Sequence, residues 1–323
     1  MQPVKPRRSL RVLVVGVGRA AALSLAALHW RGDATAVAAV DPAPANSAVL
    51  PAEVPLFPSL AELPPSLDVD VAVVSTPTPI HVEVCRDLIE RRTAPLVLCE
   101  KPLSTDAAAA AKVLAEATAA GVELRVLFHY AHASEVLWAC ERLHDLTGSH
   151  GAISGFTATF VDPYAHELPA RVEALVSSWF DSGINALSVA ARLVLLRRVL
   201  EPDVDPEEPS AGAAAIAFGG GGSGGTGRIE TSWRGRSEVK RTSFAFEDGT
   251  MLVLDHTTQT AERTARSGRR TTLFRGEGDD ARQARYRNLF DAHLRQDGTT
   301  YGHEVTTLLH TLLSDAAQAA GAG

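Results

Sequence analysis

Three polar side chains in this 323-residue chain have the types and spacing needed for proton transfer beside a reacting hydroxyl group: Lys101, Asp181 and Asn185. Lys101 follows an apolar run at residues 95–98. Asp181 and Asn185 stand four residues apart, which places them on one face of a helix. An ammonium can donate a proton, a carboxylate can accept one, and an amide can hold a hydroxyl group. If the chain also binds a nicotinamide dinucleotide, these three groups suit hydride transfer.

A glycine-rich turn near the N-terminus is the expected site for such a dinucleotide. Residues 11–15 are a β-branched apolar run typical of a strand buried on both faces, and Gly16-Val-Gly18-Arg-Ala-Ala21 follows at once. Gly16 permits a tight turn, Gly18 lets the backbone approach a pyrophosphate, and Ala21 allows a helix to pack closely on the strand. The helix predicted over residues 20–30 would offer its free N–H groups to the phosphates.

The acidic residue expected after the second strand is Asp41. A strand is predicted over residues 34–40, so the order is strand, glycine turn, helix, strand and acid. The Asp41 carboxylate would accept hydrogen bonds from the adenosine ribose, and its charge would repel a 2′-phosphate, which favours NAD over NADP. Arg19 leaves NADP open as the alternative, because a guanidinium near the ribose could bind that phosphate.

Two further strands are predicted to end at the same edge of the sheet. The strand over residues 69–74 runs into Ser75-Thr-Pro77, and the strand over residues 96–99 runs into Glu100-Lys101-Pro102. Ligands bind at the carboxyl ends of strands in such folds. His81 opens the next helix, where it could face the cofactor or cap the helix. The predicted cofactor contacts are Gly16, Gly18, Arg19, Ala20, Asp41, Ser75, Thr76, Pro77, His81, Glu100 and Lys101.

The residue pattern changes near residue 130. A helix over residues 134–146 leads into strands that follow one another without helices, which predicts an antiparallel or mixed sheet with one covered face. These strands are expected over residues 152–160, 213–218, 229–233, 239–246 and 251–254. An insertion over residues 161–200 carries Asp181 and Asn185, and helices over residues 286–294 and 305–319 close the chain.

We therefore predict an α/β protein of two domains. Residues 1–130 would form a Rossmann domain with a doubly wound parallel sheet. Residues 131–323 would form an α+β domain with a largely antiparallel open sheet, and the C-terminal helix would pack back on the first domain. The exposed face of the second sheet suggests a homodimer or homotetramer built through it.

Composition excludes several classes of protein and site. The net charge of −7 argues against nucleic acid as a partner, and no apolar run reaches the length of about 18 residues that a membrane span needs. The start of the chain shows no signal-peptide pattern, and Cys85, Cys99 and Cys140 are widely spaced, so we expect reduced thiols and a cytoplasmic protein. His129 and His132 lack the further ligands that a zinc site needs, so no metal is predicted.

With these motifs in place, the chain resembles the glucose–fructose oxidoreductase, inositol dehydrogenase and MocA family. The matching residues are Gly16-Val-Gly18, Ser75-Thr-Pro77 with His81, Glu100-Lys101-Pro102, and a helix that bears Asp181. The Glu-Lys-Pro tripeptide at its strand end is the most specific of these. The resemblance covers nearly the whole chain and implies that Lys101 lies beside the substrate and the nicotinamide, with Pro102 shaping the turn.

Asn185 stands where most enzymes of this family have a histidine. The segment from Phe180 to Ser188 resembles the branch of aldose 1-dehydrogenases, which oxidise L-arabinose or D-galactose at C1 to the lactone and use an aspartate and an asparagine. The stretch between Phe160 and Trp179 is shorter than in that branch and lacks its tryptophans. The resemblance thus implies an NAD(P)-dependent dehydrogenase or reductase acting on CH–OH groups. Alternatives are a biosynthetic keto-sugar or imine reductase and a non-catalytic NAD(P)-binding sensor.

In aldose oxidation a proton leaves the C1 hydroxyl group as hydride leaves C1. Asn185 cannot titrate, so the base must be Asp181, Lys101 or a water molecule between them. We expect Lys101 to stabilise developing alkoxide charge as a donor, and Asp181 to take the proton directly or through water. Candidate substrate contacts are His129, Tyr130 and Trp179.

Overall fold

The computed structural model describes residues 8–220, 223–278, 280–295 and 298–319. Its first sheet has six strands in the order β3-β2-β1-β4-β5-β6, and every neighbouring pair is parallel. This is the doubly wound order of a Rossmann domain, as predicted. The strands are β1 (Leu10–Val15), β2 (Ala34–Val40), β3 (Leu56–Phe57), β4 (Val71–Val74), β5 (Leu96–Glu100) and β6 (Glu123–Leu127).

Helices on both faces of this sheet explain why its strands are almost wholly apolar. They are α1 (Arg19–Arg31), α2 (His81–Glu90) and α3 (Ala107–Ala120), with short 3-10 turns η1 (Pro44–Val49), η2 (Leu60–Glu62), η3 (Thr78–Ile80) and η4 (His129–His132). The ends of α3 follow local rules. The Asp106 carboxylate accepts the N–H of Ala108 at the N-cap, and Gly121 ends the helix in the left-handed conformation, with φ 71°.

The second sheet has eight strands in the order β14-β13-β12-β11-β7-β10-β9-β8. Only β7 and β10 pair in parallel, so the predicted mixed sheet is confirmed. The strands are β7 (Ile153–Pro163), β8 (Leu196–Asp203), β9 (Ala211–Gly220), β10 (Ser223–Ser232), β11 (Arg234–Phe246), β12 (Met251–Asp255), β13 (Thr260–Thr264) and β14 (Arg270–Arg275).

Three of these strands were not expected from the sequence: β8, β13 and β14. Strands β8 and β14 are the two edges of the sheet, and β13 lies next to β14; all three carry many charged or polar side chains. The proline at position 202 also hides β8 from a pattern search, although proline is tolerated in edge strands. The expected insertion over residues 161–200 therefore ends earlier, at the start of β8.

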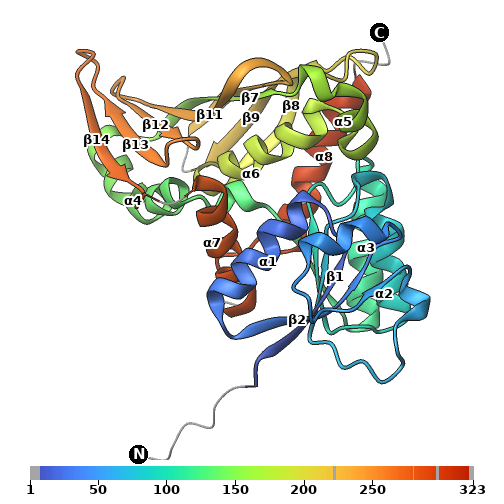
Figure 1. The fold of residues 1–323 in the computed structure, drawn as a ribbon. Helices are drawn as coiled ribbons and strands as arrows, with labels where there is room; N and C mark the ends of the chain where they lie inside the picture. Colours follow the sequence, from blue (N-terminus) through green and yellow to red (C-terminus); the bar gives the residue numbers. More distant parts are fainter. Residues whose placement is uncertain (1–7, 221–222, 279, 296–297, 320–323) are drawn as a thin grey trace, which may run out of the picture.

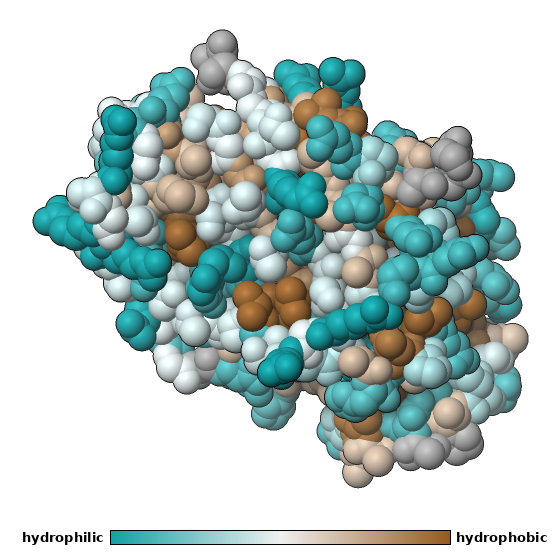
Figure 2. All heavy atoms as spheres, turned by 90° about the horizontal axis from the view of Figure 1, so that it is seen from above, coloured by the Kyte–Doolittle hydropathy of each residue, from teal (hydrophilic) through white to brown (hydrophobic). Residues whose placement is uncertain are grey.

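The helices of the second half lie along one face of its sheet or against the first domain (Figure 1). They are α4 (Ser134–His150), α5 (Leu168–Leu175), α6 (Ile184–Leu193), α7 (Ala281–Arg295) and α8 (His303–Ala319), with a short 3-10 turn over Ala165–Glu167. Helix α7 contacts α1, while α8 contacts both α3 and β8. Seen from above, the end of the molecule formed by the second half is mostly polar, with hydrophobic residues in small separate groups (Figure 2).

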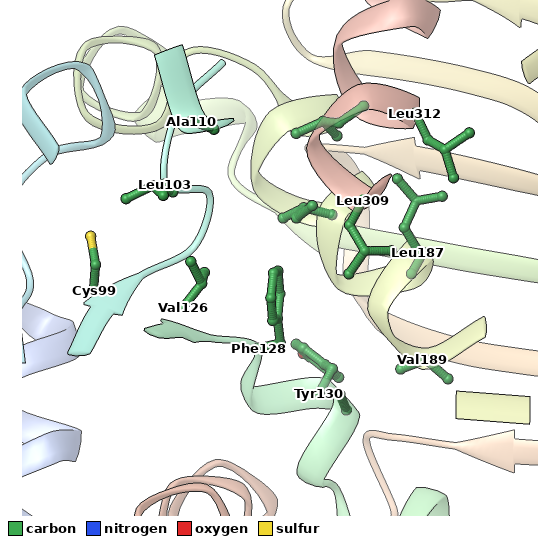
Figure 3. Packing of buried hydrophobic residues seen from close by; sticks show 14 of the residues in the cluster. Cys99, Leu103, Ala110, Val126, Phe128, Tyr130, Leu187, Val189, Leu309 and Leu312 are labelled. Atoms are coloured by element: carbon green, nitrogen blue, oxygen red, sulfur yellow. The ribbon is translucent and has the colours of Figure 1, made fainter. Parts of the chain in front are cut away.

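One hydrophobic cluster runs through both halves of the chain. Figure 3 shows its centre, where Phe128 at the end of the first sheet lies between Val126 and the helix residues Leu187 and Leu309. The Phe128 ring also makes an edge contact with Tyr301, at 5.7 Å between centroids. Shared burial of this kind fixes the two halves against each other, which is what a site built from both of them requires.

Candidate active site

A single cavity of about 1130 Å³ runs from the glycine turn of the first domain to strands β7 and β11 of the second. Of the predicted site residues, all but Trp179 line it. No group of three or more metal-ligating side chains occurs among the residues that the structure describes. None of the described helices has the length and apolar character needed to cross a bilayer.

The glycine turn fits a dinucleotide in its local geometry. Gly16 has φ +84°, and a Cβ atom there would lie 2.7 Å from the backbone nitrogen of Thr76, so a larger residue would collide with the neighbouring loop. Gly18 is the N-cap of α1 and has no side chain to accept a hydrogen bond from the start of the helix. The space where its Cβ atom would be is open. The first N–H groups of the helix therefore lack a side-chain partner and suit an anion.

Asp41 is held at the same turn by three hydrogen bonds. Its Oδ2 accepts the N–H of Val17 at 2.8 Å, and its Oδ1 accepts the N–H of Ala43 and the amide of Asn46, at 2.8 and 3.0 Å. These bonds fix the carboxylate beside the opening of α1, where it lines the cavity. Each oxygen retains lone-pair capacity for a ribose hydroxyl group.

The loop after β4 presents hydroxyl groups that lack partners. Ser75 Oγ, Thr76 Oγ1 and Thr78 Oγ1 are buried and make no hydrogen bond among the described residues. Buried polar atoms are normally hydrogen-bonded, and these three residues line the cavity. A bound ligand would supply the missing hydrogen-bond partners. Together with the glycine turn, they fit the phosphates and riboses of a dinucleotide.

His81 ties this loop to the turn that carries Lys101. Its Nδ1 lies 2.8 Å from the carbonyl oxygen of Pro102, and its Nε2 lies 2.7 Å from that of Thr76. Burial lowers the pKa of His81, although both hydrogen bonds favour the charged ring. A neutral imidazole can donate to only one of the two carbonyls. The residue opens α2, and its ring is committed to holding two loops of the cofactor side together.

The centre of the site is an ion pair between the two halves of the chain. The Lys101 ammonium donates to Asp181 Oδ1 at 2.5 Å and to the backbone oxygen of Asp181 at 2.9 Å. Both side chains are nearly buried. Burial alone would raise the pKa of Asp181, but the Lys101 charge and hydrogen bond outweigh it and hold that pKa below its usual value. The carboxylate is therefore ionised at neutral pH.

Asn185 lies beside this pair and has one free oxygen. Its Nδ2 donates to the backbone oxygen of Asp181 at 3.0 Å, while its Oδ1 is buried without a partner. Asp181 belongs to a π-helical turn, Trp179–Gly183, that leads into α6. Such turns interrupt the regular helix and occur often at functional sites. Asp181 and Asn185 lie close together, as predicted. The free amide oxygen can accept a hydrogen bond from a donor on a ligand.

The candidate contact Trp179 is not in the cavity, and this prediction needs correction. Its side chain is fully buried in the core, and the indole N–H donates to the carbonyl of Leu313 in α8 at 2.9 Å. A Cβ atom on Gly183 would lie 3.0 Å from the indole ring, so the glycine makes room for it. Trp179 supports the π-helical turn from behind instead of touching a ligand.

His129 and Tyr130 line the cavity next to Glu100. The His129 ring stacks on Tyr286, with centroids 5.3 Å apart, and the Tyr286 hydroxyl donates to Glu100 Oε1 at 2.7 Å. Burial and then the Lys101 charge hold the pKa of His129 well below its usual value, so this ring is neutral. Burial also raises the pKa of Glu100. This wall therefore places a neutral imidazole beside a carboxyl group whose pKa is raised.

A second buried ion pair was not predicted from the sequence. Lys240 in β11 pairs with Asp162 in β7, and Ser182 Oγ donates to the same carboxylate at 3.2 Å. All three side chains line the cavity. Burial raises the pKa of Asp162 even with Lys240 beside it. Period-two alternation along β11 puts Lys240 on the inward face with Thr242, which is the one signal in the sequence that could have revealed it.

Arg19 lines the cavity but pairs with a residue of the second half of the chain. Its guanidinium lies 3.6 Å from the carboxylate of Glu167, beside α5 in the second half of the chain, and is otherwise largely exposed. Asp41 therefore keeps the turn acidic, which agrees with a preference for an unphosphorylated ribose.

Residues 10–128 match the family described as GFO_IDH_MocA, an oxidoreductase family with an NAD-binding Rossmann fold. They form a domain of that family. The resemblance seen in the Glu-Lys-Pro tripeptide and the glycine turn is thereby confirmed for this NAD-binding domain. The aldose dehydrogenase branch of the family is a finer assignment that this match does not make.

The chain is also similar to individual known proteins. Inositol 2-dehydrogenase of Pseudarthrobacter chlorophenolicus is 33% identical over 119 residues, which are 35% of this chain and 34% of that enzyme. The crystal structure of GenD2 from gentamicin A biosynthesis, in complex with NAD, has a TM-score of 0.79 at 20% identity and covers 98% of this chain and 95% of its own.

An inositol dehydrogenase homologue from Azotobacter vinelandii, complexed with NADH and myo-inositol, also has a TM-score of 0.79, at 16% identity, covering 98% of this chain and 97% of its own. At such identities the structures show a shared fold. The fold shared with these two structures therefore extends over both halves of this chain.

Proposed function

We propose that this protein is an NAD-dependent oxidoreductase that transfers hydride between the nicotinamide and a hydroxyl-bearing carbon of a sugar or sugar-like substrate. One observation carries the proposal: the Lys101–Asp181 ion pair and the free Asn185 oxygen face the cavity that begins at the dinucleotide turn. An acid, a base and a hydroxyl acceptor thus line one cavity.

The residues at the turn would bind the cofactor through its phosphates and riboses. The N-terminus of α1 would face the pyrophosphate, and the free hydroxyl groups after β4 would complete the contacts. Asp41 would accept hydrogen bonds from the adenosine ribose, which makes NAD the preferred cofactor and NADP the weaker one. When bound, the nicotinamide supplies the acceptor for hydride.

Proton transfer would be shared by Lys101 and Asp181. The Lys101 ammonium has two oxygen partners now and a third N–H available, so it can donate to the substrate oxygen as negative charge develops there. Asp181 would take the hydroxyl proton directly or through water. Its lowered pKa makes it a weak base at rest, and a substrate oxygen that draws Lys101 away would strengthen it.

The specific reaction that we propose is oxidation of an aldose at C1 to the lactone. The support is the asparagine at position 185 together with the likeness of its segment to the aldose 1-dehydrogenase branch. Reduction of a keto-sugar or an imine would use the same groups in reverse and stays the alternative. A non-catalytic sensor would not need a buried lysine–carboxylate pair beside a free amide oxygen, which argues against that function.

The test is turnover of a panel of free aldoses with NAD and with NADP, followed by nicotinamide absorbance. We expect NAD reduction that Lys101→Met and Asp181→Asn each lower by at least about 10³-fold. Lys112→Met is the matched control, because Lys112 is exposed on α3. No turnover of any aldose, with turnover of keto-sugars and NADH, would favour the reductase. Equal background rates for wild type and Lys101→Met would favour the sensor.

We also propose a homodimer or homotetramer built through the open face of the second sheet. The three cysteines are free thiols, and a cytoplasmic location stays a prediction. Light scattering on the purified chain would give the oligomeric state, and a monomer at all concentrations would contradict it.

A further inference from the structure

Arg285 is a buried cation in the cavity wall that lacks a carboxylate partner. Its side chain is on α7 and is 3% exposed. The guanidinium donates to the backbone oxygen of His256 at 2.9 Å and to the Tyr130 hydroxyl at 3.5 Å, and it lies 4.2 Å above the Tyr130 ring. Its Nε is buried without an acceptor among the described residues.

Every other cation at this end of the cavity is paired. Lys101 contacts Asp181, Lys240 contacts Asp162, Arg282 contacts Glu238 at 2.7 Å, and Arg171 contacts Glu167 at 3.0 Å. Arg285 has no carboxylate within 4.0 Å in the part of the chain that the structure describes. The buried acid Glu135 reaches it only indirectly, since that carboxylate pairs with the His256 ring at 2.6 Å.

A guanidinium has five N–H donors, and acceptors among the described residues take two of those of Arg285. Leaving buried donors and a buried charge uncompensated is costly, so a resident acceptor is expected. The Tyr130 ring covers one face of the guanidinium, which leaves its edge for a ligand. Edge-on pairing with two parallel hydrogen bonds is the geometry of a carboxylate.

Tyr130 adds a second donor at the same place. Its oxygen accepts from Arg285, while its own hydrogen has no acceptor among the described residues. Burial raises the pKa of Tyr130 to about 12, so the phenol keeps this hydrogen at neutral pH. Tyr130 directly follows His129. The His129 ring stacks on Tyr286, which donates to Glu100, the residue before Lys101. The pair thus lies in the same cavity as the ion pair of the proposed reaction.

We propose that Arg285 and Tyr130 bind a carboxylate of the substrate, so that the preferred substrate is a sugar acid and not a neutral sugar. This inference rests on the proposed hydride transfer. The carboxylate is bound and undergoes no chemistry, and it orients the ring so that the reacting carbon faces Lys101 and Asp181. The neighbouring ion pairs remain intact, because the anion would compensate Arg285, which has no carboxylate partner among the described residues.

Matched sugars test the assignment, because D-galactose, D-galacturonate and D-galactose 6-phosphate differ only at C6; the D-glucose series gives a second configuration. For the wild type we expect kcat/KM to be about 10- to 100-fold higher for the uronate than for the neutral sugar, as charge-assisted hydrogen bonds allow. Isothermal titration of D-galacturonate into the NADH complex should show binding that D-galactose does not match.

Variants then locate the effect. Arg285→Met should remove the preference for the uronate mainly through KM, and Arg285→Lys should restore part of it, because it keeps the charge but loses the planar fork. Arg295→Met on the exposed end of α7 is the matched control and should keep the preference. If Arg285→Met does not fold, Tyr130→Phe provides the milder test, with a partial loss of preference expected.

Equal kcat/KM values for the neutral sugar and the uronate would overturn the inference, and so would a preference for the phosphate ester. A preference that survives Arg285→Met in folded protein would also overturn it. These outcomes leave the proposed function standing, provided that turnover depends on Lys101. Absence of hydride transfer with every sugar, neutral or acidic, would instead refute the proposed function and this inference with it.

Discussion

Lys101 and Asn185 donate hydrogen bonds to the same backbone oxygen, that of Asp181, at 2.9 and 3.0 Å. This shared acceptor lies in the π-helical turn before α6. The turn is therefore bound by the Lys101 ammonium of the first domain and by the Asn185 amide of the helix that follows it. The arrangement aims the Asp181 carboxylate at Lys101 and leaves the second atom of the amide, Asn185 Oδ1, without a protein partner.

Asn185→Asp should lower kcat by about 10²-fold or more, because one buried donor is lost and a second carboxylate is placed beside Asp181. Steady-state kinetics with the sugar identified in the panel would measure it. The affinity for NADH, followed by its fluorescence, should change little, which separates an effect on the reaction from loss of fold. Turnover at the wild-type level would remove Asn185 from the site.

The Lys240–Asp162 pair is expected to behave as a unit in folding. Lys240→Met or Asp162→Asn alone should destabilise the protein by about 3–5 kcal/mol, because each leaves an uncompensated buried charge. The double variant should be more stable than either single one. Urea unfolding of the four proteins measures the coupling, and additive losses would show that the two side chains act independently.

Gly16 and Gly268 provide a matched comparison, since both have φ +84°. Alanine at either position incurs the strain of the left-handed region, but only at position 16 does the added Cβ atom meet backbone, 2.7 Å from Thr76. Gly16→Ala should weaken NADH binding by at least about tenfold because the loop must shift at the phosphate site. Gly268→Ala should not. Similar affinities for both variants would contradict the role given to the turn.

Acid should destabilise the protein through buried neutral histidines, of which His310 is the clearest. Its Nδ1 donates to Thr306 and its Nε2 accepts the N–H of Leu103, and burial lowers its pKa from 6.5 to about 4. The unfolded chain therefore binds the proton first as pH falls. The stabilisation is complete above the unfolded value and is lost as pH falls through the folded one, a change of about 3 kcal/mol for this group.

Urea unfolding between about pH 7 and pH 4.5 would measure that dependence. The free energy of unfolding of His310→Gln should fall less steeply with acid than that of the wild type, even if the variant starts less stable. Parallel curves for the two proteins would show that His310 does not contribute.

The parts of the site that local sequence determines were predictable, and those that depend on distant pairing were not. The turn from Gly16 to Asp41 and the strand end at Lys101 each lie within one βαβ segment, and the spacing of Asp181 and Asn185 is a single helical turn. Asp162 and Lys240 are 78 residues apart in the sequence, so their contact cannot be predicted from residue type or spacing.

Trp179 shows the opposite failure. It was named as a candidate substrate contact, but its indole lies in the core and donates to the carbonyl of Leu313. Strands β8, β13 and β14 of the second sheet were missed for a related reason. Their partners, and not their own hydrophobic pattern, make them strands.

Because Lys101 comes from one half of the chain and Asp181 from the other, the charged pair exists only while the halves are docked. Under the proposed function, a second half that changes its substrate can replace nearly all of its cavity wall, yet it must still supply one carboxylate to a lysine that belongs to the first half. The position of Lys101 in the first half therefore restricts where the second half can place Asp181. It does not restrict which side chains of the second half contact the substrate.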